Sequence, residues 1–147
     1  MALRKAKISD IKLFYNLRNQ PDVRNYSENN KKIIYQQHKL WFQLNFKKKN
    51  NFFFVITLKS KDIGYLRVQK KEKSYYVSIC IAKRFRRLNI AHRSLLELSK
   101  KMRKKIILVA NVNKKNISSI ILFIKSGFRI FKINKKNLKM KKKNINL

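Results

Sequence analysis

A basic loop between a predicted strand and a predicted helix has the residue types that bind a phosphate. The strand is predicted over residues 74–82, the loop over 83–89, and the helix from there to about Met102. The first N–H groups of a helix lack partners inside the helix and lie at the positive end of its dipole, so they can bind a phosphate or pyrophosphate. Four arginines add positive charge at this point: Arg84, Arg86, Arg87 and Arg93.

A second candidate lies at the start of the next predicted helix. Asn116 is a residue type that caps helix N-termini, and Gly127 is typical of the position after a helix C-terminus. Between them, isoleucines recur at the spacing of one helix face: Ile117, Ile120, Ile121 and Ile124. We expect this face to pack on the core.

The elements that must position these residues alternate between strands and helices. Strands are predicted over residues 3–6, 52–58, 63–69, 74–82, 105–112, 128–133 and 138–142. In the strand over 74–82, Tyr76, Ser78 and Cys80 point away from the face that carries Ile79. Two further helices are predicted, one after a cap at Ser9 or Asp10 and one over residues 31–46. The buried stripe of the second is expected to include Ile34, His38, Trp41 and Leu44.

This order predicts a single α/β domain with a mixed sheet of about six to seven strands and about four flanking helices. Its expected limits are residues 1–134, followed by a basic C-terminal strand or tail over 135–147. The sequence contains no apolar run long enough to cross a membrane and no secretory signal. A lone Cys80 excludes an internal disulfide, so we expect a cytoplasmic protein that binds no metal.

The net charge of +33 admits two explanations. One is nucleic-acid binding. The other is drift in an AT-rich genome, because the chain has 29 Lys, 18 Ile and 16 Asn but only 2 Gly and 1 Pro. The sequence has no RNA-reading motif, and its aromatic residues fall mainly at core spacing. We therefore expect nucleic acid to bind only non-specifically.

The loop and the downstream segment together resemble the GNAT superfamily of acyl-CoA N-acyltransferases. That family has a cofactor loop of the form Arg/Gln-x-x-Gly-x-Gly/Ala, which Arg86-Arg87-Leu88-Asn89-Ile90-Ala91 fits except at Asn89. Its later signature is matched by Asn116, Phe123, Gly127 and Phe128. The predicted order of elements also matches, so the resemblance covers nearly the whole chain.

The resemblance implies that acetyl-CoA is the co-substrate and that a primary amine is acetylated. Backbone groups of Ile79, Cys80 and Ile81 would bind the pantetheine arm, and the N–H groups of residues 86–91 would bind the pyrophosphate. Asn116 would contact the pantetheine. The family transfers the acetyl group directly, so Cys80 is expected to pack and not to act as a nucleophile. The last hairpin mediates dimers in many members, which makes a homodimer an open expectation.

Three residues depart from the family pattern. Asn89 stands at a glycine position, where asparagine is the least costly substitute if φ must be positive. Arg87 also replaces a common glycine and adds a cation. Phe123 stands where many members place a tyrosine that protonates the departing thiolate, and phenylalanine cannot do this.

The N-terminal third resembles a GNAT subgroup that acetylates nucleotide-linked amino sugars, including those of pseudaminic and legionaminic acid pathways. The matching residues are Arg18, Asn19, Val23, Arg24, Ser27, His38, Trp41 and Phe42. Arg18 and Arg24 have the chemistry to pair with a diphosphate, and Trp41 would lie with them at the substrate. His38 is a candidate base or a structural residue. Tyr76 and Ser78 would line an acceptor cleft or only pack.

The preferred prediction is therefore an acetyl-CoA-dependent N-acetyltransferase acting on a nucleotide-linked amino sugar. Three alternatives stay open: an acetyltransferase of peptide or ribosomal-protein N-termini, a basic nucleic-acid-binding protein, and a GNAT fold that has lost catalysis and persists as a binding module.

Overall fold

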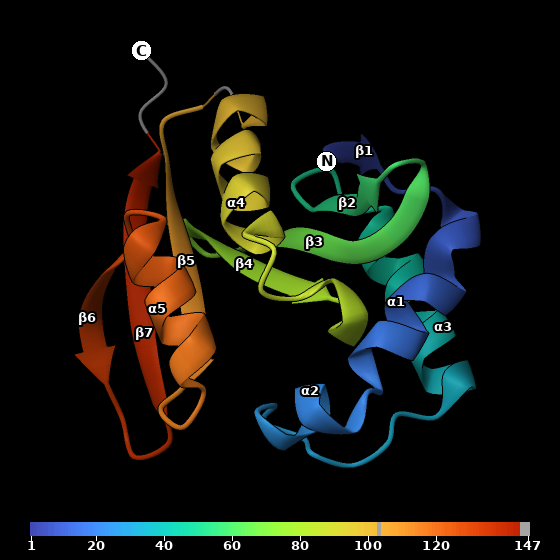
Figure 1. Cartoon of the computed structure of the whole chain (residues 1–147), viewed down its shortest axis with the longest axis horizontal. Helices are drawn as coiled ribbons and strands as arrows, with labels where there is room; N and C mark the ends of the chain where they lie inside the picture. Colours follow the sequence, from blue (N-terminus) through green and yellow to red (C-terminus); the bar gives the residue numbers. More distant parts are fainter. Residues whose placement is uncertain (103, 145–147) are drawn as a thin grey trace.

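The computed structural model describes residues 1–102 and 104–144, which form a seven-stranded sheet with helices on both faces (Figure 1). The strands are β1 (Ala2–Lys5), β2 (Phe52–Leu58), β3 (Lys61–Lys71), β4 (Ser74–Ile81), β5 (Ile106–Asn113), β6 (Arg129–Ile133) and β7 (Asn137–Asn144). The helices are α1 (Ile11–Arg18), α2 (Pro21–Asn25), α3 (Tyr35–Phe46), α4 (Ile90–Lys101) and α5 (Ile117–Lys125). Short 3₁₀ turns cover Ile8–Asp10 and Lys83–Phe85. The predicted α/β class and mixed sheet are confirmed.

The strand order is β1-β2-β3-β4-β5-β7-β6, and every neighbouring pair is antiparallel except β4 and β5. These two parallel strands pair through Tyr75 with Leu108 and Tyr76 with Val109. Beyond this short contact they turn away from each other toward their carboxyl ends (Figure 1). The sheet therefore opens at the end of β4, where the phosphate-binding loop was predicted.

Two apolar clusters lie on opposite faces of the sheet. The larger packs α4 and α5 against the strands, with Leu98, Ala110 and Met140 fully buried. The smaller joins α1 and α3 to β2, β3 and β4, where Phe14 stacks on Tyr65 at a ring distance of 4.6 Å. Burying one such aromatic side chain stabilises the fold by about 1.5–3 kcal/mol. The two clusters hold β3 and β4 from both sides.

The buried stripe predicted for residues 31–46 is wrong in part. The helix begins at Tyr35, and Ile34 and Leu44 are exposed. The buried face carries His38, as predicted, together with Phe42. The helix is rotated from the predicted phase because the Phe42 ring packs against several aromatic neighbours and so buries more apolar surface than Ile34 or Leu44 would. Those neighbours are Phe14, Phe46 and Phe53.

The isoleucine face predicted for residues 117–124 is also wrong in part. Ile117, Ile121 and Ile124 are exposed in α5, and the fully buried side chain is Phe123. Phe123 meets Phe128 edge-on at 5.0 Å, and this aromatic contact orients the helix. One further difference is minor, since the predicted break at Pro21 and Asp22 contains the short helix α2. The predicted last hairpin is confirmed, because β6 and β7 pair antiparallel and β7 lies between β5 and β6. Residues 145–147 lie outside the described part.

The loop before α4 contains two residues in the left-handed backbone region. Arg87 has φ of 62° and Asn89, the N-cap of α4, has φ of 59°. These are the two positions at which the sequence lacks the glycines of the GNAT pattern that it resembles. A side chain with a Cβ costs about 1–2 kcal/mol in this conformation, and asparagine tolerates it better than most.

We expect the stability of the Asn89 variants to follow backbone tolerance. Asn89→Ala should lower the free energy of unfolding by about 1 kcal/mol, whereas Asn89→Gly should leave it unchanged or higher. The measurement is urea denaturation followed by circular dichroism. Lys125→Ala is the control, since Lys125 Nζ donates to Asn89 Oδ1 at 3.1 Å on the exposed surface. An Asn89→Ala variant as stable as the wild type would contradict the argument.

Candidate active site

The opening between β4 and β5 continues into two adjoining cavities. The larger, of about 1510 Å³, lies along β4, the loop before α4 and the start of α5. The smaller, of about 630 Å³, lies between α1, α3 and β3. Four side chains line both cavities: Arg18, Tyr65, Arg67 and Lys71. The two spaces therefore meet at residues of α1 and β3.

The end of the larger cavity that is predicted to bind a phosphate is formed by the loop before α4 and the first turn of α4. Arg87, Asn89, Ile90 and Ala91 line it. α4 is twelve residues long, so its N-terminal N–H groups and dipole present positive charge to this space. Leu88 does not line the cavity, because its side chain is exposed to solvent.

The Arg86 side chain binds to other groups of the protein. Its guanidinium donates to the Ile81 carbonyl at 2.9 Å and to Gln20 Oε1 at 3.0 Å, and it forms an ion pair with Asp22. Burial alone would raise the pKa of Asp22, but the hydrogen bond and charge of Arg86 hold that pKa below its ordinary value. Arg86 thus ties the phosphate-binding loop to the segment around α2.

The wall formed by β4 contains the predicted pantetheine-binding residues and the two predicted polar ones. Ile79, Cys80 and Ile81 line the larger cavity together with Tyr76 and Ser78. Burial raises the pKa of the Cys80 thiol to about 11, so the thiol stays protonated and a poor nucleophile at neutral pH. This agrees with the expectation that Cys80 packs.

The start of α5 forms the opposite wall. Asn116 caps the helix, with Oδ1 accepting from the Ser119 N–H at 3.2 Å, and its side chain also lines the larger cavity. Phe123 lines the same cavity from a buried position and brings no proton donor to it. Capping and contact with a bound ligand are therefore compatible roles for Asn116.

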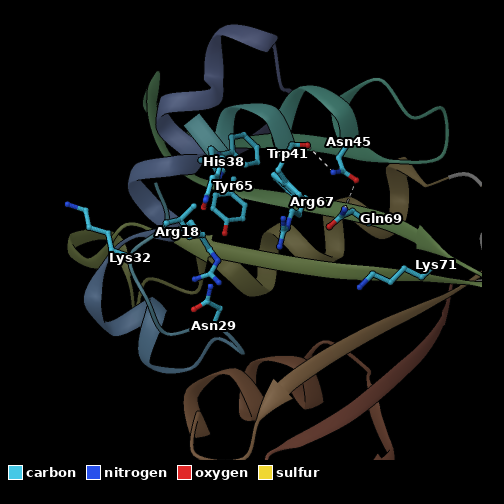
Figure 2. A pocket seen from close by; sticks show the side chains of 13 residues that line it. Arg18, Asn29, Lys32, His38, Trp41, Asn45, Tyr65, Arg67, Gln69 and Lys71 are labelled. Carbon is cyan, nitrogen blue, oxygen red and sulfur yellow. Dashed lines mark hydrogen bonds between the residues drawn. The ribbon is translucent and has the colours of Figure 1, made fainter. Parts of the chain in front are cut away.

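The smaller cavity holds three buried nitrogens without hydrogen-bond partners within the described part of the chain: Arg18 Nη1, His38 Nε2 and Arg67 Nε. Arg67 lies over the Trp41 ring at 4.7 Å. Figure 2 shows Arg18 from α1 and Arg67 from β3 with Tyr65 between them in the view, while Lys32 and Lys71 extend away from this centre. Unpartnered buried polar groups are costly and are rare in folded proteins, so these three make the smaller cavity a candidate ligand site.

The charges around His38 keep its ring neutral. Burial lowers the pKa of His38 to about 4, and the nearby charges of Arg67 and Arg18 act in the same direction. A hydrogen bond to the Ile11 backbone acts in the opposite direction and raises this pKa. Burial also raises the pKa of Tyr65 to about 12. At neutral pH the smaller cavity therefore presents an unprotonated imidazole and a protonated phenol.

Most of the predicted site residues line one of the two cavities, but not all. His38 and Trp41 line the smaller cavity and Arg18 lines both, whereas Arg24 lines neither, since its Nε donates to the Asn19 carbonyl at 3.1 Å. The residue that the sequence argument missed is Arg67. Its signal was an arginine inside the apolar strand predicted over residues 63–69.

Two absences hold for the described residues. They contain no cluster of three His, Cys, Asp or Glu side chains able to hold a metal ion. None of their helices combines the length and apolar character needed to cross a membrane.

Comparisons with known proteins agree with this geometry. The model of the acetyltransferase (GNAT) domain matches residues 1–129. No curated protein matches the chain in sequence. Among solved structures, a ribosomal-protein-alanine N-acetyltransferase from Brucella melitensis is 19% identical with a TM-score of 0.79, covering 97% of this chain and 99% of its own.

Two further solved structures share the fold. The spermidine N-acetyltransferase from Vibrio cholerae, in complex with CoA and spermine, is 18% identical with a TM-score of 0.75, covering 95% of this chain and 92% of its own. A GNAT-family acetyltransferase from Streptococcus pneumoniae is 16% identical with a TM-score of 0.75, covering 97% and 98%. With a family match over most of its length, the chain belongs to the GNAT family and is an acyl-CoA N-acetyltransferase.

Proposed function

We propose that this chain transfers the acetyl group of acetyl-CoA to the primary amine of a nucleotide-linked amino sugar. The observation that carries the proposal is the composition of the smaller cavity. Four cationic side chains line it, and its lining contains no carboxylate: Arg18, Lys32, Arg67 and Lys71. A nucleotide-linked sugar carries a diphosphate, which guanidinium and ammonium groups bind well.

The same lining disfavours a polycationic acceptor. The Vibrio cholerae neighbour was solved with spermine, but its 18% identity to this chain supports only a shared fold. A polyamine in the smaller cavity of this chain would meet like charges at Arg18 and Arg67 with no carboxylate to offset them. A peptide N-terminus is the second candidate acceptor, and the test below separates it from the sugar nucleotide.

The larger cavity would hold acetyl-CoA, which supplies an activated acetyl thioester. The N-terminal turn of α4 and Arg87 would bind its pyrophosphate, and the free backbone edge of β4 near Ile79 would bind its pantetheine arm. The β4 edge is available because β5 pairs with β4 through Tyr75 and Tyr76 alone. Asn116 would approach the pantetheine from α5.

Within this proposal the acceptor amine attacks in its unprotonated form. As the C–N bond forms and the CoA thiolate leaves, His38 accepts the proton that the nitrogen loses, because the unpartnered Nε2 of the neutral ring offers a lone pair in the smaller cavity. Tyr65 lines both cavities and keeps its phenolic proton. It can therefore donate a hydrogen bond, whereas Phe123 has no donor group. Tyr76 and Ser78 are proposed to orient the acceptor from the β4 side.

We expect the stability of the protein to report the buried state of His38. An unfolded histidine takes up its proton near pH 6.5, whereas folded His38 does so near pH 4. Stability should therefore fall as the pH drops from 6.5 toward 4, by up to about 3 kcal/mol. His38→Gln should lose this slope and reduce kcat about 100-fold.

The control for the slope is His92→Gln, since His92 is the second of the chain's two histidines. It lies at α4 and contacts Ser126 Oγ at 2.9 Å. His92→Gln should keep most of the pH dependence. If His38→Gln retains the full slope, or if its kcat matches that of the wild type, His38 has neither the buried neutral state nor the proposed role.

Two variants of Asn116 separate its cap from its proposed contact with acetyl-CoA. Asn116→Ala removes both and should lower the free energy of unfolding by about 1 kcal/mol. Asn116→Ser keeps a capping oxygen and should unfold like the wild type. Both should weaken acetyl-CoA binding, measured by calorimetry at moderate salt. Wild-type affinity in both variants would exclude Asn116 from the cofactor site.

The acceptor is identified by an acetylation panel. The full chain is incubated with acetyl-CoA and, separately, amino-sugar nucleotides, peptides with free N-termini, and spermidine, and products are measured by mass spectrometry. We expect a singly acetylated sugar nucleotide with the highest kcat/KM. Faster acetylation of a peptide would replace the acceptor, and acetylation of none would mean that the fold binds without catalysis.

A further inference from the structure

The two arginines of the smaller cavity have no counter-charge among residues 1–102 and 104–144. Within these residues Arg18 Nη1 and Arg67 Nε are buried and without hydrogen-bond partners, although an arginine remains protonated at any physiological pH. Burial lowers the pKa of Arg67, which is the direction expected for a cation removed from water. The Trp41 ring offsets part of this cost from one side of the guanidinium.

The carboxylates that could have paired with these arginines are committed elsewhere. The chain has only six acidic residues. Asp10 and Asp62 pair with Arg4, Asp22 pairs with Arg86, and Glu97 lies near Lys101. Glu28 accepts a hydrogen bond from Asn111, and Glu72 lies in the turn between β3 and β4. None of the six lines the smaller cavity.

Both side chains are half-buried at the cavity wall, with one nitrogen of each guanidinium buried and unpartnered. A cation partly removed from water is costly unless a partner compensates its charge, and a bound anion would do so. We propose that Arg18 and Arg67 form a subsite for one oxyanionic group of the acceptor, a phosphate or a carboxylate. This inference rests on the proposed acetyl transfer to an amine. The sequence predicted that Arg18 and Arg24 pair with a diphosphate. In the subsite Arg67 takes the place of Arg24, because Arg24 lines neither cavity.

The subsite also sets the surroundings of the proposed base. The charges that face His38 are those of Arg67 and Arg18, and both lower its pKa. An anion held by these two guanidiniums would offset their charge and make His38 Nε2 more basic when the acceptor is bound. Acceptors without the anionic group would then lose both binding and proton transfer.

Trp41 provides a direct probe of the subsite. It is the only tryptophan in the chain, it lines the smaller cavity, and Arg67 covers its ring. Titrations of Trp41 fluorescence at 150 mM salt would use uridine diphosphate, inorganic phosphate, acetate and spermidine as separate probes. We expect a saturable change with at least one anion and none with spermidine. A response to the phosphate probes alone assigns the subsite to a phosphate, and a response that includes acetate assigns it to a carboxylate as well.

Substitutions then separate the subsite from the general positive charge. Arg67→Gln and Arg18→Gln should each weaken anion binding about tenfold or more, because charge-assisted hydrogen bonds are lost. Arg67→Lys should give an intermediate loss, since it keeps the charge but not the planar fork. The matched control is Arg129→Gln on exposed β6, which removes the same charge outside both cavities and should change affinity less than twofold.

Stability and steady-state kinetics separate this subsite from a structural role of Arg67. If Arg67 serves only to stack on Trp41, Arg67→Gln will lower the melting temperature of the ligand-free protein. A ligand subsite predicts an unchanged or higher melting temperature and a KM for the acceptor raised at least tenfold, with the KM for acetyl-CoA unchanged. A nuclear magnetic resonance titration of His38 should show its pKa rising when the anion binds.

The inference and the proposed function can fail separately. Anion binding that depends on Arg67, without acetylation of any amino-sugar nucleotide, would support the subsite and overturn the proposed acceptor. Acetylation of a sugar nucleotide with an acceptor KM that Arg67→Gln does not raise would overturn the subsite and leave the function. Equal losses in Arg67→Gln and Arg129→Gln would show surface binding only and overturn the subsite.

Discussion

β4 and β5 are hydrogen-bonded to each other through two residue pairs, and the position of the larger cavity depends on this short contact. The other strands pair over most of their length, so the sheet is rigid on each side of the opening. β3 approaches β4 so closely that a Cβ on Gly64 would lie 2.5 Å from the Cys80 carbonyl oxygen. Because β3 holds β4 on one side, the separation from β5 leaves the other backbone edge of β4 free for a ligand.

Arg86 connects the loop before α4 to the segment around α2. Its guanidinium reaches Gln20 and Asp22 at the start of α2. α2 follows directly after Arg18, and Asn19 in turn exchanges two hydrogen bonds with the backbone of Ile33 at the rim of the smaller cavity. The loop that would bind the co-substrate and the segment that encloses the acceptor are thus parts of one hydrogen-bonded network.

The sequence was sufficient to predict the strands, the two helices of the C-terminal half, and most of the residues of β4 and of the loop before α4 that line the larger cavity, because each depends on local patterns. A Lys/Arg-rich loop between a strand and a helix, and an asparagine cap, can be recognised over a few residues. The buried face of α3 could not be recognised in this way. A period of 3.6 residues fits both the predicted face and the face through Phe42, and only packing against Phe14 and Phe53 determines which face is buried. Arg67 was missed because its strand reads as an apolar run, and its exposure to a cavity depends on α1 and α3, which lie elsewhere in the sequence.

Positive charges on the surface and positive charges inside a cavity differ in what they indicate about a ligand. Surface lysines are fully solvated, so accumulating them through compositional drift costs little, and they favour any anion equally. A guanidinium in a cavity without an anionic partner loses hydration that a ring contact, such as that of Arg67 with Trp41, offsets only in part, so drift does not place it there without cost. Of the 39 cationic residues, Arg18 and Arg67 therefore say most about the ligand. The total charge brings anions to the protein, whereas these two residues determine where in the acceptor cavity an anionic group is held.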